Sequence, residues 1–83
     1  MKYAFRLQVT KPAHDYTTKE ERDTIARKAV TDAEKHDLKK GDYVFFHVNE
    51  NLRVVVDFPN RLIQIMSARE YFDAGFPPCP HVN

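Results

Sequence analysis

The sequence contains little glycine and little cysteine, and each shortage excludes a class of protein. Only two of its 83 residues are glycines, so it has no glycine-rich loop of the kind that brings backbone amides against a bound nucleotide. Its single cysteine, Cys79, cannot form an internal disulfide, which indicates a fold made for a reducing compartment. No apolar run approaches bilayer length, and residues 1–6 reach charged side chains too early for a signal peptide. We therefore expect a cytoplasmic protein that makes no contact with a membrane.

An excess of charge of one sign is missing as well. Thirteen basic and twelve acidic side chains give a formal net charge of +1. A domain held on nucleic acid by phosphate contacts needs a clustered basic excess, so any nucleic-acid binding is expected to be weak. Hydrophobic residues make up 42% of the chain and charged residues 30%, which is the balance of a globular protein. Residues 1–83 are therefore expected to form a single domain.

Two different periodicities divide the first half of the chain. Residues 3–10 carry apolar side chains at every second position, which predicts a strand with one buried face, and residues 11–16 are expected to form a loop. Thr18 and Glu21 have the spacing of a capping box, which marks the beginning of a helix that ends before Gly41. The apolar stripe of this helix consists of Ile25, Ala26, Ala29, Val30 and Ala33.

Three short strands are predicted in the second half. Residues 43–48 are apolar on both sides, whereas residues 52–58 alternate, and residues 61–66 form the last of the three. Pro59 cannot adopt a positive φ, so the connection before the last strand is expected to be a type I turn with a bulge or a longer loop.

A second helix and a tail complete the chain. Ser67 and Glu70 repeat the capping-box spacing, and Gly75 stands where a glycine ends a helix over residues 68–74. Residues 76–83 are rich in proline and are expected to be an extended tail. The resulting fold class is α+β, with a single-layer, mostly antiparallel four-stranded sheet in the order β-α-β-β-β-α and one long helix packed on one face.

The sheet face opposite the long helix is the candidate functional surface. One long and one short helix are too small to cover both faces of four strands, and an exposed apolar patch usually marks an interaction surface. The sequence leaves open which alternating set of the second strand faces outward, either Tyr43, Phe45 and His47 or Val44, Phe46 and Val48. The candidate binding residues are Arg6, Gln8, Tyr43, Phe45, His47, Arg53 and Val55.

Three interpretations of this face remain open. The second helix and the tail fold over it, or it forms a homodimer or binds another protein, or its aromatic side chains stack on single-stranded bases while arginines hold phosphate. The arginines distinguish the last two. Convergence beside exposed aromatics favours nucleic acid, whereas dispersal or pairing with acidic residues favours a protein partner. The residues concerned are Arg6, Arg53, Arg61 and Arg69, with Asp57, Glu70 and Asp73 as the acidic partners.

No catalytic or metal-binding constellation is predicted. The four histidines are scattered along the chain, and Cys79 and His81 form a C-x-H pair without the second pair of ligands that zinc requires. Cys79 also has no base held beside it by a rigid element, which a nucleophilic cysteine needs. We expect no metal, no small-molecule cofactor and no catalytic residue.

One stretch resembles a known family in outline. Residues 46–56, together with residues 63–65 and 70–71, are similar to the C-terminal sheet of RelE/HigB-like ribosome-dependent mRNA endonucleases, over less than a third of the chain. The resemblance implies RNA cleavage by basic, tyrosine or histidine side chains on the sheet. Here the helical hairpin that begins such toxins is replaced by a strand and one helix. The matching positions are His47, Arg53, Arg61, Arg69 and Tyr71.

The sequence therefore predicts a small non-enzymatic binding or regulatory protein, of a size common among bacterial or phage accessory factors. It is expected to act through protein–protein contacts or self-association on the candidate face. The alternative is an RNA-directed protein, either a single-strand binder or a divergent endonuclease of the family named above.

Overall fold

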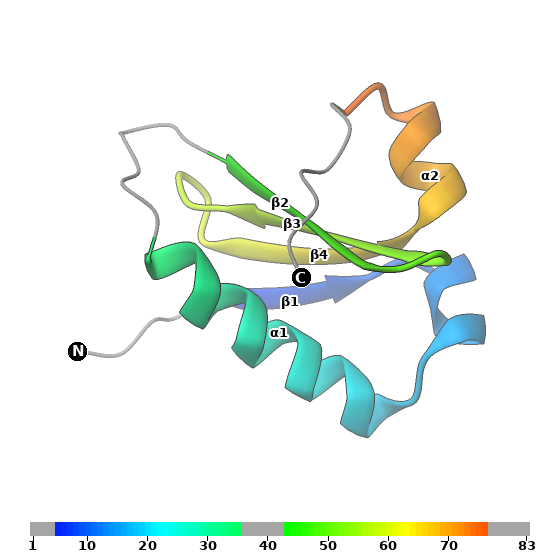
Figure 1. The fold of residues 1–83 in the computed structure, drawn as a ribbon, viewed down its shortest axis with the longest axis horizontal. Helices are drawn as coiled ribbons and strands as arrows, with labels where there is room; N and C mark the ends of the chain where they lie inside the picture. The colour runs from blue at the N-terminus through cyan, green and yellow to red at the C-terminus, as the bar shows by residue number, and fades with distance from the viewer. Residues whose placement is uncertain (1–4, 36–42, 77–83) are drawn as a thin grey trace.

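Four strands and two α-helices follow one another in the predicted order. The computed structural model describes residues 5–35 and 43–76, and it confirms the α+β class (Figure 1). A 3₁₀ helix, η1, occupies the segment that was expected to be a loop. The elements are β1 (Arg6–Val9), η1 (Pro12–Tyr16), α1 (Lys19–Glu34), β2 (Tyr43–Asn49), β3 (Leu52–Asp57), β4 (Leu62–Ser67) and α2 (Ala68–Asp73).

The strands form one mixed sheet in the order β1-β4-β3-β2. The pairs β2–β3 and β3–β4 are antiparallel and consecutive in the chain, whereas β1 pairs in parallel with β4. The first strand therefore lies beside the last, because α1 carries the chain across the sheet between β1 and β2 (Figure 1). The sheet is mostly antiparallel, as predicted.

Helix α1 packs on one face of the sheet through its small side chains. Thr18 caps it as expected: the Thr18 hydroxyl accepts from the Glu21 backbone N–H at 3.2 Å, and the Glu21 carboxylate accepts from the Thr18 N–H at 2.8 Å. Ala29 and Ala33 are buried against the sheet, where the absence of a larger side chain lets the helix lie close. The main core between α1 and the sheet contains Phe46, Leu52, Val54, Val56, Ile63 and Ile65.

A second, smaller cluster lies on the opposite face, beneath α2. Val55, Met66 and Tyr71 are buried there, and Phe45 and Phe76 pack against them. The ring centroids of Tyr71 and Phe76 are 5.2 Å apart, and those of Phe45 and Phe76 are 5.6 Å apart. Figure 1 shows α1 and α2 on opposite sides of the sheet, so the two clusters are separated by the strands themselves.

Helix α2 has the predicted cap at each end. Ser67 and Glu70 form the expected capping box, and Gly75 follows the helix at φ 81°, a conformation that side chains other than glycine rarely adopt. Helix α1 ends at Glu34 with Lys35 as its C-cap, before Gly41 as expected. Gly41 itself and residues 77–83 of the proline-rich tail lie outside the described residues.

The connection between β3 and β4 is the longer loop that Pro59 predicted. Four residues separate Asp57 from its partner Leu62, and the Arg61 N–H donates to the Phe58 carbonyl at 3.2 Å. Arg61 has a φ of 52°, in the left-handed region.

Among residues 5–35 and 43–76, neither helix has the length and apolar content that crossing a bilayer requires.

Candidate functional site

The face of the sheet opposite α1, called the outer face below, carries all seven candidate residues. The pairing register places them in three rows across the strands, because directly opposed residues point to the same side. The choice left open by the sequence is settled in favour of Tyr43, Phe45 and His47, since Val44, Phe46 and Val48 pack toward α1. The rows are Arg6, Leu62, Asp57 and Tyr43; then Gln8, Gln64, Val55 and Phe45; then Met66, Arg53 and His47.

Val55 lies on the outer face but is not available to a partner. Its exposed fraction is 0%, because Tyr71 of α2, together with Met66 and Phe76, closes over this part of the sheet. The expectation that a short helix leaves the face open is thus corrected for its centre. A six-residue helix suffices there because aromatic side chains extend its cover beyond the width of its backbone.

The exposed side chains of the outer face lie along its two edges, whereas Asp57 and Met66 are buried like Val55. Arg6 and Gln8 on the edge strand β1 are exposed, and Leu62 and Gln64 beside them on β4 are half-buried. Tyr43, at the opposite edge, is 45% exposed while its ring stacks on Phe45 with centroids 6.4 Å apart and an interplanar angle of 8°. Exposed side chains therefore lie at both edges of the outer face, with the buried aromatic cluster between them.

Phe72 adds a large apolar side chain to the same side of the molecule. It follows the buried Tyr71 on α2 and is 81% exposed, the most of any large hydrophobic residue described. Phe72 was not among the residues predicted for this surface, and neither were Leu62, Gln64 and Met66 on the outer face. The alternation of residues 61–66 contained the signal for the strand residues, whereas Phe72 needed the orientation of α2.

The four arginines do not converge. Arg53 donates through Nη1 to the backbone carbonyls of Asn49 and Leu52, which holds it against the β2–β3 hairpin. Arg69 lies 3.9 Å from Asp73 on exposed helix α2. Arg6 stands on the edge strand β1, in a different row from Arg53, and its backbone N–H donates to the Arg61 carbonyl at 3.0 Å. Arg6 and Arg61 are therefore neighbours, whereas Arg53 and Arg69 lie elsewhere.

The positions implied by the endonuclease resemblance do not form one exposed group, although His47 lies directly opposite Arg53 in the β2–β3 register. Arg61 precedes β4 and Arg69 follows it, so the length of a six-residue strand, about 20 Å, lies between them. Tyr71 is buried within the aromatic cluster, away from any solvent-exposed substrate. The register therefore brings His47 and Arg53 together, whereas Arg61 lies at the other end of β4 and Tyr71 is buried.

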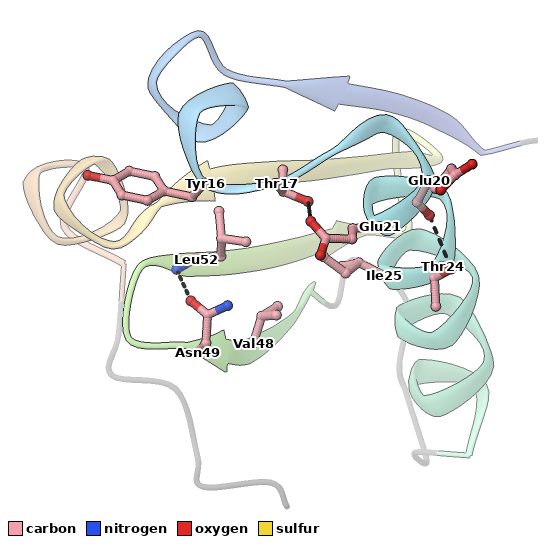
Figure 2. A pocket seen from close by; sticks show the side chains of 9 residues that line it. All are labelled: Tyr16, Thr17, Glu20, Glu21, Thr24, Ile25, Val48, Asn49 and Leu52. Carbon is pink, nitrogen blue, oxygen red and sulfur yellow. Dashed lines mark hydrogen bonds between the residues drawn. The ribbon is translucent and has the colours of Figure 1, made fainter.

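A shallow groove of about 380 Å³ opens on the other side of the sheet, between the beginning of α1 and the β2–β3 hairpin (Figure 2). Its floor is apolar, with Leu52 fully buried and Ile25 half-buried, and its rim carries Glu20 and Glu21. Hydrogen bonds from the Thr18 backbone N–H and the Thr17 hydroxyl hold the pKa of Glu21 below its ordinary value. A carboxylate with a lowered pKa is a weak base at neutral pH.

The Glu70 carboxylate likewise accepts hydrogen bonds from the protein itself. Its Oε1 accepts from the Thr10 hydroxyl at 2.6 Å and from the Ser67 backbone N–H at 3.0 Å, which ties the end of β1 to the beginning of α2. Burial raises the pKa of Glu70, but these hydrogen bonds lower it by more, so the pKa lies below its ordinary value.

A second hollow lies beside Glu70 and has a volume of about 410 Å³. It is lined by Pro12, Tyr16, Asn51, Ser67, Ala68, Arg69 and Glu70.

Neither a metal site nor an orphaned polar group is present in the described part of the chain. Residues 5–35 and 43–76 contain no group of three or more histidine, cysteine or acidic side chains placed to hold a metal ion. Every buried side-chain polar atom there has a hydrogen-bond partner. The Cys79 and His81 pair lies outside the described residues.

Comparison with known proteins places the chain in no family. No family model matches the sequence, and no match of significance is found among curated proteins or solved structures.

Proposed function

We propose that this chain is a small non-enzymatic protein that acts by binding another protein through its outer side, made of the outer face and α2. The observation that carries the proposal is the pair of exposed aromatic residues on that side: Tyr43, whose ring stacks on Phe45, and Phe72, which follows the buried Tyr71 on α2. Aromatic side chains beside a packed apolar centre are typical of protein interfaces.

The distribution of charge supports a protein partner over RNA. Arg53 is bonded to backbone carbonyls, Arg69 is beside Asp73, and Arg6 and Arg61 lie together at the far edge. Among residues 5–35 and 43–76, no row of basic side chains therefore follows the aromatic residues. The two carboxylates with a shifted pKa, Glu21 and Glu70, are shifted toward weaker bases, which does not favour general-base catalysis.

Site-specific photo-crosslinking in the source cells tests the proposal. A photoreactive phenylalanine analogue at Phe72 or Tyr43 is expected to give one defined crosslinked protein. The same analogue at Tyr16 is the matched control, because Tyr16 is 50% exposed but lies on η1, between the two shallow hollows. Equal capture at all three positions, or capture at none, would contradict the proposal.

Titration of labelled oligonucleotides at two salt concentrations tests the alternative. We expect duplex and single-stranded probes to bind no tighter than the non-specific range of about 10⁻⁴–10⁻⁶ M. Submicromolar binding that weakens steeply with salt would favour the RNA-directed function instead.

A further inference from the structure

Strand β2 presents a regular edge of the sheet to its surroundings. It is the terminal strand in the order β1-β4-β3-β2, and within residues 5–35 and 43–76 no strand pairs with its outer side. Its register with β3 is regular from Tyr43 to His47, and the irregularity between His47 and Asn49 lies at the far end. The direction of its backbone groups follows from the hydrogen bonds of the other strands.

The phase of the ladder is fixed at β1. The backbone N–H groups of Arg6 and Thr10 donate to the carbonyls of Arg61 and Ile65, each at 3.0 Å. The backbone groups of odd-numbered residues in β4 therefore face β1, and those of even-numbered residues face β3. The bond from the Ala68 N–H to the Asn51 carbonyl, at 2.9 Å, agrees with this assignment.

The same alternation continues to β2. In β3, Val55 directs its backbone groups to β4, so Val54 and Val56 direct theirs to β2. Their partners Phe46 and Val44 complete those bonds. The N–H and C=O groups of Tyr43 and Phe45 consequently point away from the sheet, toward any strand that adds to it.

Within residues 43–47 this edge carries none of the charge or proline that keeps natural sheet edges apart, and its irregularity lies beyond His47. The segment 43–49 contains no charged residue and no proline, whereas the opposite edge, β1, has four residues, carries Arg6 and is followed closely by Pro12. An uncharged strand can meet a second copy of itself without repulsion between like charges. Antiparallel pairing of identical edges is also self-complementary about a twofold axis.

We infer that the β2 edges of two copies of this chain pair antiparallel and join their sheets into one of eight strands. Tyr43 of each copy then lies opposite Phe45 of the other, and the two outward residues exchange backbone hydrogen bonds. Both side chains project from the outer face, so the aromatic clusters of the two copies become continuous. The inference rests on the proposed function to the extent that it uses outer-face residues and names a second copy as partner.

Chemical synthesis of the 83-residue chain allows the edge to be tested without changing a side chain. Sedimentation velocity from micromolar to millimolar concentration is expected to show a monomer–dimer equilibrium. Methylation of the Phe45 backbone nitrogen removes one outward donor and should weaken the dimer at least tenfold in Kd. Methylation of the Leu7 nitrogen is the matched control, because that N–H also points outward, but at the β1 edge, and it should leave the Kd unchanged.

The outcomes separate this inference from the proposed function. A monomer at every concentration, or a dimer indifferent to methylation at Phe45, would overturn the pairing of β2 edges. A dimer that is lost on Phe72→Glu but unaffected by methylation would likewise overturn it while supporting an interface on the outer side. Pairing of the β2 edge with a strand of a different protein, in place of a second copy, would also count against it.

Discussion

The two sides of the sheet differ both in composition and in the way they are covered: the side toward α1 is apolar, whereas the outer face also carries Arg6, Gln8 and Arg53. On one side α1 contacts the sheet through alanines, so the helix backbone lies close to the strands and covers the main core. On the other side a six-residue helix covers only the centre, through Tyr71 and Phe76, and leaves Tyr43 and Phe72 exposed. The first arrangement stabilises the fold, whereas the second leaves large apolar groups at a surface. The difference indicates which side has room for a partner.

Adjacent residues of β4 compare the two sides directly. Ile65 is fully buried toward α1, and Met66 is buried toward α2. We expect Ile65→Ala to lower the free energy of unfolding by about 4 kcal/mol and Met66→Ala by about 2 kcal/mol, because the shallow cluster collapses or admits water more readily. Urea denaturation of both variants measures the difference. Equal losses would show that the outer side is packed as firmly as the main core.

Close approach of α1 to the sheet is tested by enlarging one contact. Ala29→Leu is expected to overpack the interface and lower the free energy of unfolding by roughly 1–3 kcal/mol. Arg27→Leu, on the exposed side of the same helix, should change it by less than about 0.5 kcal/mol. Thermal denaturation followed by circular dichroism measures both variants. Equal melting temperatures would contradict the close packing of α1 on the sheet.

The link between β1 and α2 predicts a dependence of stability on pH. The pKa of Glu70 is lower in the folded protein than its ordinary value of 4.5, so its contribution is complete above that pH and is lost as the pH falls through the folded value. We expect the native protein to lose more stability between neutral pH and pH about 3 than Glu70→Gln does. Parallel pH profiles for the two proteins would show that the carboxylate contributes nothing.

The smallest expected effect concerns the β3–β4 loop, away from both clusters. Arg61→Gly removes the Cβ from a residue at φ 52° but gives the unfolded chain more freedom, so the net gain in stability should stay below about 1 kcal/mol. Arg61→Ala keeps the Cβ and should give no gain. A loss on Arg61→Gly would instead reveal a role for the side chain.

Local rules predicted the parts of the fold that local interactions determine. Both capping boxes, the stripe around Ala29 and the glycine cap at Gly75 follow from short-range spacing, and each is present. The outward set of β2 could not be chosen, because apolar side chains on both sides of residues 43–48 leave no polar face to mark the surface.

The features that could not be predicted from the sequence depend on tertiary contacts. The parallel pairing of β1 with β4 joins segments far apart in the chain, and no local signal specifies it. The burial of Val55 depends on the position of α2, which follows β4 directly, and on the turn after α2 that places Phe76 against the sheet. The seven candidate residues were therefore assigned to one face of the sheet correctly, while their exposure required the structure.

The hydrogen bond between Thr10 and Glu70 has a consequence for the order in which the chain folds. Strands β2, β3 and β4 are joined by short connections and form a hairpin-linked unit, whereas β1 must close a loop of more than fifty residues to reach β4. The unit of local strands is expected to form first, and β1 to dock onto a β4 whose other side is already paired. The 2.6 Å contact to Glu70 then fastens the late strand to the N-terminal turn of the last helix. Amide exchange in native protein should accordingly release β1 as a separate, less stable unit before β3 opens.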